Sequence, residues 1–185
     1  MKKFGKYSDS ELYALLREPK ETAEGAFAEL YNRHSQKIYA YIIRVLGSTE
    51  DVNDLFQEAM LKFYDSAREA HKVDNVPAFL ITITRNLCLN YKRDKKATLR
   101  FDDYNLYSND RSYEYKEMLD LISSSLELLD FDYREAFVLR QYQGFSYKEI
   151  SDITGETIQT IKNKVWRAKE KIKTILEPYL QDMSN

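Results

Sequence analysis

Residues 145–172 (FSYKEISDITGETIQTIKNKVWRAKEKI) constrain the fold most, because they contain two helical patterns joined at a single glycine. Ser146 can cap the first helix, and Glu149, three residues later, completes a capping box. The first pattern stops at Gly155, a residue that suits the C-terminus of a helix. Two helices joined by a tight turn at a glycine predict a helix-turn-helix motif.

The second of these helices is expected to have two different faces. It starts near Thr157 or Thr160 and continues without glycine or proline to the residue before Pro178. At about 100° per residue, side chains three and four positions apart share a face. The apolar face, expected to pack on the rest of the domain, contains Ile158, Ile161, Val165, Ala168, Ile172 and Leu176. The opposite face contains Gln159, Asn163, Trp166 and Arg167, and is flanked by Lys162, Lys164, Lys169, Lys171 and Lys173.

The polar face of this helix favours DNA recognition over the alternative, a solvated basic helix. Residues 162–173 contain six basic residues and one acid, a net charge of +5. Trp166 lies on the polar face, where a core tryptophan would not be, and glutamine and asparagine can pair with adenine edges. Lysines beside them lie where phosphates run along a major groove. The predicted DNA-binding residues are Gln159, Thr160, Lys162, Asn163, Lys164, Trp166 and Arg167.

The rest of the 185-residue chain predicts an all-α protein of two small helical domains. Five glycines, three prolines and little apolar alternation argue against strands. Helices are expected over 8–18, 22–46, 50–68, 78–96, 114–129 and 132–141. Residues 98–113 lose the helical period and gain Asp and Asn, so we predict domains over 1–97 and 114–185 joined by an acidic linker.

The composition limits where the protein can be located in the cell and which chemical groups it can bind. The single cysteine, Cys88, allows no internal disulfide, and no apolar run is long enough to span a bilayer. The N-terminus lacks an apolar signal core, so we expect a cytoplasmic protein without membrane insertion. His34 and His71 suggest no metal set, and no cofactor is expected.

Charge blocks mark two further candidate surfaces. Asp51, Asp54 and Glu58 share one face of the predicted helix 50–68, which could be a solvated face or an acidic site of an enzyme. No histidine or cysteine lies near them in sequence, which disfavours catalysis. Residues 85–100 have a net charge of +5. This segment could be a core helix with a solvated basic end, or a second nucleic-acid surface.

Three co-linear segments resemble the extracytoplasmic-function group of bacterial sigma factors. DVNDLFQEAMLKFY at 51–64 resembles the family's helix for binding core RNA polymerase, and PAFLITITRNLCLNYKRDKK at 77–96 resembles its helix for the melting promoter element. Residues 145–172 resemble its helix-turn-helix, although GETIQT replaces the family's usual turn. The resemblance covers about residues 22–178 in the family's order.

The resemblance assigns roles to the charged surfaces. It implies that a face of helix 50–68 docks core polymerase through Asp51, Asp54, Leu55, Gln57, Glu58 and Leu61. It also implies that Asn86 and the loop at 65–76 capture a flipped base of the non-template strand, with Phe63 and Tyr64 as stacking residues or as core. Phosphate contacts are expected from Arg85, Lys92, Arg93, Lys95 and Lys96.

We therefore expect a non-enzymatic transcription-initiation factor. It would bind core RNA polymerase, double-stranded promoter DNA and the melted non-template strand, and would have an anti-sigma factor as a partner. The upstream element would be read by the C-terminal domain and the melting element by the N-terminal one. A free-standing helix-turn-helix regulator is the alternative, but it leaves the acidic helix and the second basic helix unexplained. A second alternative is an enzyme that acts on nucleic acid, but the sequence shows no candidate nucleophile and no set of acidic metal ligands for one.

Overall fold

The computed structural model describes residues 4–47, 51–69, 72–98, 121–122 and 124–182, and these residues contain no strand. They divide into two compact units, which are described separately here. The first comprises residues 1–42 and 49–94, and the second comprises residues 43–48 and 95–185. The predicted all-helical class is confirmed for the described residues. The predicted linker lies outside them except for Thr98, so the predicted domain boundaries stay a prediction.

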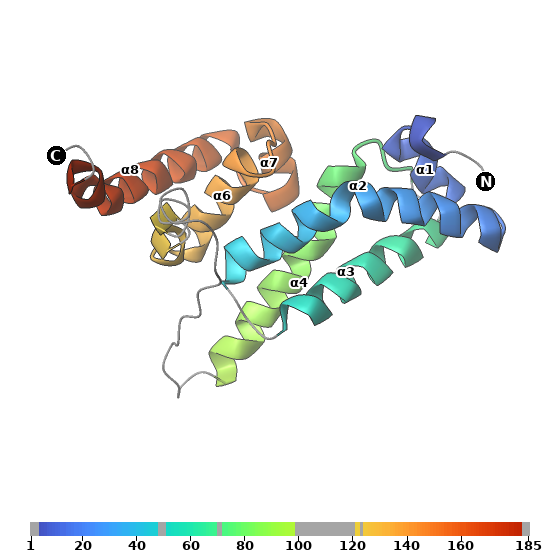
Figure 1. The fold of residues 1–185 in the computed structure, drawn as a ribbon, viewed down its shortest axis with the longest axis horizontal. Coiled ribbons are helices and arrows are strands. Elements are labelled where there is room, and N and C mark those ends of the chain that lie inside the picture. Colours follow the sequence, from blue (N-terminus) through green and yellow to red (C-terminus); the bar gives the residue numbers. More distant parts are fainter. Residues whose placement is uncertain (1–3, 48–50, 70–71, 99–120, 123, 183–185) are drawn as a thin grey trace. The chain divides into compact units, whose positions relative to one another are not determined.

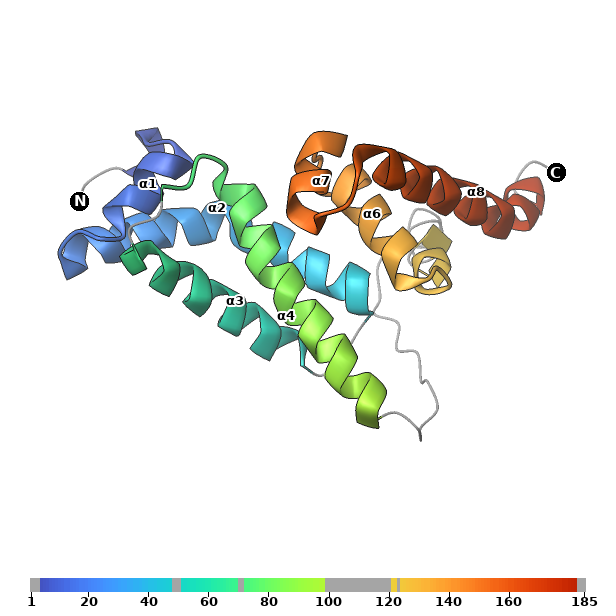
Figure 2. The ribbon, with the colours of Figure 1, turned by 180° about the vertical axis from the view of Figure 1, so that it is seen from behind.

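The first unit is built mainly from long helices. Its elements are η1 (Phe4–Lys6), α1 (Asp9–Leu15), most of α2 (Lys20–Leu46), α3 (Val52–Ser66), η2 (Ala67–Glu69) and most of α4 (Val76–Thr98). Figures 1 and 2 show α3 beside α2, with α4 crossing them. Aromatic rings join these helices, with Phe27 of α2 on Tyr64 of α3, and Phe63 of α3 near Phe79 of α4. Burial of Leu30, Tyr41, Ile42, Leu80 and Ile81 completes the core.

Local signals in the sequence determine where these helices begin. Ser8 caps α1 in a capping box with Glu11, and the hydrogen bonds that Ser8 donates lower the pKa of the Glu11 carboxyl group. Asn75 caps α4 by accepting a 3.0 Å hydrogen bond from the backbone N–H of Ala78. Pro77 therefore lies in the first turn of α4, where the missing N–H costs nothing.

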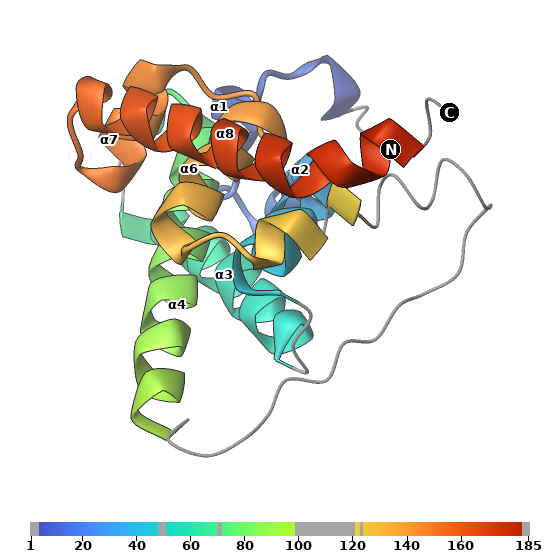
Figure 3. The same cartoon turned by 90° about the vertical axis from the view of Figure 1, so that its left-hand side faces the viewer.

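The second unit contains the helix-turn-helix that the sequence predicts. Its named helices are α6 (Phe131–Gln141), α7 (Tyr147–Thr154) and α8 (Ile158–Asp182), preceded by helical residues at 121–122 and 124–127. Figure 3 shows α8 lying across α6, with α7 at one end of α8. Their shared core contains Leu126, Leu129, Val138, Leu139, Ile150, Ile153, Ile161, Val165, Ala168 and Ile172. Leu176 packs at its margin.

Two details predicted for α8 are wrong. Ile158, expected in the core, is 42% exposed; it is the first residue of α8 and precedes the first buried side chain of the stripe, Ile161. The helix also continues through Pro178 to Asp182 instead of ending before the proline. A proline removes one backbone donor from a helix, and in α8 this loss does not end the helix.

The turn between α7 and α8 requires the backbone freedom of glycine. Gly155 has φ 76°, and its N–H donates to the carbonyl of Ser151. We expect Gly155→Ala to destabilise the second unit by about 1–2 kcal/mol, because a Cβ is strained in the left-handed region. Gly155→Asn should cost less, since asparagine tolerates this region. Hydrogen exchange of α7 and α8 amides in the full chain measures both variants. Equal exchange in the wild type and Gly155→Ala would contradict the expectation.

Candidate nucleic-acid interface

Hydrogen bonds at the turn determine where α8 starts and which way it faces. Thr157 accepts a 3.1 Å hydrogen bond from the backbone N–H of Thr160, so it caps the first turn of α8. Before the turn, Ser146 and Glu149 form the predicted capping box of α7, with a 2.8 Å bond from the Ser146 N–H to the Glu149 carboxylate. Both helices therefore begin at defined residues on either side of Gly155.

The predicted polar face of α8 is exposed in the structure. Gln159 and Asn163 lie on one side of the helix, where the Gln159 amide donates a 3.0 Å hydrogen bond to the Asn163 carbonyl. Trp166 is 62% exposed, although tryptophan is the side chain with most to gain from burial. Thr160 and Arg167 are also exposed, and the Arg167 guanidinium donates to the Tyr133 hydroxyl at 3.2 Å. Amide, aromatic and guanidinium groups thus share one solvent-facing surface.

The lysines of α8 are not equivalent. Lys162 is exposed, with its ammonium 5.8 Å from the centre of the Tyr147 ring. The Lys164 side chain is only 17% exposed and lies 2.5 Å from the Glu156 carboxylate and 3.7 Å from that of Asp132. Lys164 therefore joins α6, the turn and α8, which differs from the exposed phosphate ligand that the sequence predicts. Its predicted contact with DNA stays a prediction.

Sequence reasoning missed several cation–tyrosine contacts around α8. The Arg140 guanidinium lies 4.8 Å from the centre of the Tyr147 ring, which is the ring that Lys162 also contacts. Lys171 lies 5.0 Å from the centre of the Tyr133 ring, whose hydroxyl also accepts from Arg167. The tyrosines come from α6 and α7, so only the tertiary structure brings them to these cations. Such contacts orient basic side chains without neutralising them.

The predicted polymerase-binding residues of α3 separate into surface and interior. Asp54, Gln57, Glu58 and Leu61 are exposed, and Leu61 is 65% exposed although it is fully apolar. The Glu58 carboxylate lies 3.1 Å from the Lys62 ammonium on the same helix. These four residues are called the α3 face below. They lie three or four positions apart, as neighbours on one side of a helix do.

Two residues predicted for this surface have structural roles instead. Leu55 is only 8% exposed and belongs to the core, so it is left out of the α3 face, and its contact with polymerase stays a prediction. The position is one helical step from Asp54, which turns its side chain inward by about 100°. Asp51 is half-buried at the start of α3 and accepts a 2.7 Å hydrogen bond from the Tyr91 hydroxyl of α4.

The predicted residues of α4 are also distributed unevenly. Asn86 and Lys95 are exposed, and exposed Arg93 pairs with Asp94 at 3.5 Å. Arg85 and Lys92 are half-buried and have polar partners within the protein. Ala70, His71 and the side chain of Lys96 lie outside the described residues.

Of the two candidate stacking residues, Phe63 is fully buried and is a core residue. Tyr64 is half-buried, with its ring against Phe27 and the Arg68 guanidinium 5.8 Å from the ring centre. Near the end of α3, neither of these aromatic rings is fully exposed, so a base would meet mainly polar and basic side chains there.

Within the described ranges, no three His, Cys, Asp or Glu side chains gather as they would around a metal ion. None of the helices described is both long enough and apolar enough to cross a membrane.

Comparisons with known proteins match both units. Sigma-70 region 2 matches residues 30–98, and Sigma-70 region 4 matches residues 119–172. RNA polymerase sigma factor SigZ of Bacillus subtilis is 30% identical over 152 residues, covering 80% of this chain and 86% of SigZ. ECF RNA polymerase sigma factor EcfG of Rhodopseudomonas palustris is 30% identical over 144 residues, covering 74% of this chain and 77% of EcfG.

The chain belongs to the extracytoplasmic-function (ECF) sigma factors. This sigma factor directs RNA polymerase to promoters. A free-standing regulator is not favoured, because the relatives align with both regions of the chain. Among solved structures, sigma factor RpoE in complex with anti-sigma factor NepR from Bartonella quintana has the same fold, with a TM-score of 0.68. The two are 23% identical, and the match covers 82% of this sigma factor and 96% of RpoE.

The ion pairs of Lys164 predict that it stabilises the second unit of this sigma factor, whereas Lys162 does not. Lys164→Ala should cost about 1–3 kcal/mol, because it removes the partner of the partly buried Glu156 carboxylate. Lys162→Ala, two residues away on the same helix, should change stability by less than about 0.5 kcal/mol. Hydrogen exchange of α6 and α8 amides measures both costs. The expectation is wrong if the two variants lose equal stability.

Proposed function

We propose that this sigma factor divides promoter recognition among three surfaces. The polar face of α8 reads the upstream, minus-thirty-five element, the α3 face docks core RNA polymerase, and α4 with the connection at 65–76 acts on the melting, minus-ten element. The observation that carries the proposal is the exposed row of Gln159, Asn163 and Trp166 on a helix whose other side is buried. The protein supplies binding energy and the polymerase performs the chemistry, so the sigma factor itself is not an enzyme.

The side chains of α8 have different roles in the proposed recognition of the upstream element. Asn163 and Gln159 suit adenine, Arg167 suits guanine, and Trp166 can touch a thymine methyl group. Exposed Lys162, on the flank of the helix, contributes phosphate attraction and does not choose a base. Since Tyr133 holds the Arg167 guanidinium at 3.2 Å, Arg167 is oriented before DNA arrives.

We expect Arg167→Ala to cost about 1–3 kcal/mol of binding and to relax preference at one base position. Lys162→Ala should weaken binding to all sequences alike and flatten the salt dependence by about one unit. Binding of the full chain to point-substituted duplexes at several salt concentrations measures both. The two roles are assigned the wrong way round if Lys162→Ala alters base preference and Arg167→Ala lowers affinity equally for every duplex.

The α3 face has the chemistry of a docking surface for a basic helical partner. Asp54 and Glu58 supply negative charge, Gln57 supplies hydrogen bonds, and exposed Leu61 supplies apolar area at the C-terminal end of the row. Charge complementarity steers such encounters, while burial of an apolar side chain supports affinity. We assign this face to the clamp of core polymerase.

Charge reversal on the α3 face should abolish core binding. We expect Asp54→Lys with Glu58→Lys to prevent co-purification with core polymerase and run-off transcription from a cognate promoter, with helicity retained. Glu18→Lys with Glu21→Lys makes the same charge change at exposed positions elsewhere in the first unit. This control should bind core as the wild type does. Core binding by the first variant at the control's level would refute the docking assignment.

An anti-sigma factor is the further partner we propose, because RpoE was solved in complex with the anti-sigma factor NepR. Such a partner would act by covering the α3 face or the polar face of α8. The chain also acts in the cytoplasm under this proposal, since its polymerase and promoters are there.

A further inference from the structure

Helix α1 contacts both ends of the connection between α3 and α4. The Tyr13 ring is buried, with its centre 5.3 Å from that of Phe63 near the end of α3 and 6.0 Å from that of Phe79 at the start of α4. The Tyr13 hydroxyl is 3.0 Å from the Ser66 hydroxyl, at the last residue of α3. One side chain of α1 therefore joins the two helices between which the connection runs.

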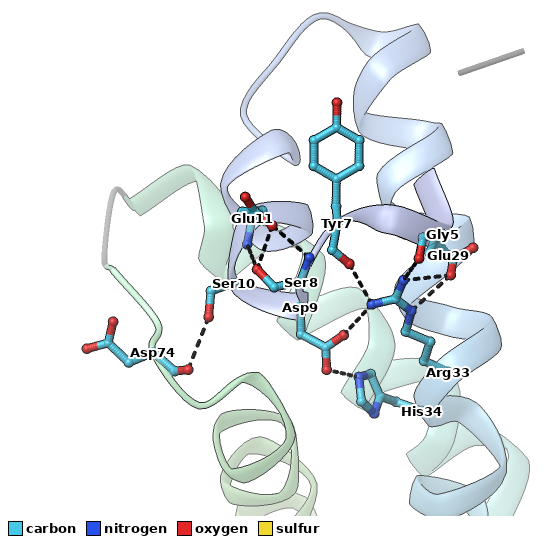
Figure 4. A network of polar contacts seen from close by, with 10 residues as sticks. All are labelled: Gly5, Tyr7, Ser8, Asp9, Ser10, Glu11, Glu29, Arg33, His34 and Asp74. Carbon is cyan, nitrogen blue, oxygen red and sulfur yellow. Dashed lines mark hydrogen bonds and ion pairs between the residues drawn. The ribbon is translucent and has the colours of Figure 1, made fainter. Parts of the chain in front are cut away.

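Two further polar contacts extend from α1 to the backbone of the connection. The Arg17 guanidinium donates a 2.7 Å hydrogen bond to the carbonyl of Ala67, which follows α3. The Ser10 hydroxyl donates a 3.1 Å hydrogen bond to the carbonyl of Asp74, just before α4 (Figure 4). Carbonyls at and beyond a helix end have no partner within that helix, and α1 supplies hydrogen-bond donors to two carbonyls of this kind.

The described side chains of this connection bury little apolar surface. Arg68, Glu69, Lys72, Asp74 and Asn75 are exposed, Val73 is half-buried, and only Ala67 among the described residues between α3 and α4 is fully buried. Segments with little buried apolar surface open at low free-energy cost unless hydrogen bonds hold them. The contacts from α1 are therefore well placed to determine how often the connection departs from its folded position.

Helix α1 is itself fixed to α2 by a dense polar cluster. The Arg33 guanidinium lies 2.8 Å from the Asp9 carboxylate and 2.9 Å from that of Glu29, and it donates to the carbonyls of Gly5 and Tyr7 (Figure 4). The bond to Asp9 is the main cause that raises the pKa of Arg33. His34 adds a 2.7 Å contact to Asp9.

The short helix η1, which precedes α1, also packs against α2. A Cβ on Gly25 would clash with the Phe4 ring, so the ring occupies the space that a larger residue would need. Together with the Arg33 cluster, this contact makes α1 a fixed support rather than a loose terminal helix.

We propose that α1 is a positioning element for promoter melting, in which Ser10 and Arg17 hold the ends of the α3–α4 connection where the melting strand is engaged. The inference rests on the proposed role of the connection and Asn86 in melting. Ser10 and Arg17 act through the backbone they hold and not by touching DNA. A purely structural role for α1 would instead affect all functions of the first unit alike.

The test removes the two backbone contacts and leaves the Tyr13 ring in place. In the Ser10→Ala, Arg17→Met variant, amide exchange over residues 66–75 should become about tenfold faster, because each net hydrogen bond changes an opening equilibrium by about two- to tenfold. Open-complex formation on a duplex promoter should slow by a similar factor. Core binding and upstream-element binding should stay at wild-type levels.

Two matched variants accompany the test. Arg17→Lys keeps a donor of similar reach, so it should restore much of the exchange protection and of the melting rate. Glu18→Gln changes the neighbouring exposed residue and should behave as the wild type. Asn86→Ala, which leaves α1 intact, should slow melting without changing exchange over residues 66–75.

The outcomes separate this inference from the proposed function on which it rests. If exchange over 66–75 is unchanged in the double variant, the inference is wrong. It is also wrong if exchange is faster and melting stays normal while Asn86→Ala slows melting; the proposed function of α4 then stands. If neither Asn86→Ala nor the double variant slows melting, the assignment of this surface to the melting element fails, and the inference fails with it.

Discussion

Burial of one side of α8 determines which of its side chains can meet DNA. Ile161, Val165, Ala168 and Ile172 are buried against α6 and α7, which leaves the side chains on the far face in solvent. Because the helix is rigid, a rotation that exposed the apolar stripe would also turn the amides of Gln159 and Asn163 away from the groove. Each buried methylene contributes about 0.8 kcal/mol, so the orientation is held by far more free energy than any single base contact supplies.

Electrostatics within the two units assigns different roles to chemically identical side chains. Lys162 and Lys164 are two residues apart, yet one faces solvent beside a tyrosine and the other is enclosed by carboxylates from two elements. Asp51 and Asp54 differ in the same way, since only the first accepts a hydrogen bond from Tyr91. Charge counted along a chain therefore overstates the charge available to a partner, because part of it neutralises the protein's own groups.

The sequence predicts most of what depends on neighbouring residues along the chain. The cap at Ser146, the glycine turn at Gly155 and the exposure of Trp166 all follow from local spacing, and the structure has them. Contacts between elements that are distant along the chain could not be predicted from local spacing. The ion pairs of Lys164 with Glu156 and Asp132 require knowing which elements pack against α8. The support that α1 gives the connection joins residues 50 to 64 positions apart, and no period in the sequence reports such a contact.

These long separations in the first unit have a consequence for synthesis on the ribosome. Helix α1 is made before its partners at Phe63, Ser66, Ala67 and Asp74. The first unit cannot close around α1 until the chain has left the exit tunnel as far as Asp74, since a long-range contact forms only when both of its segments are available. In the second unit, α6, α7 and α8 follow one another closely along the chain, and Asp130 and Lys171 are 41 residues apart. Nascent chains would therefore expose the apolar side of α2 for longer than that of α8, which makes the first unit the part that most needs protection before release.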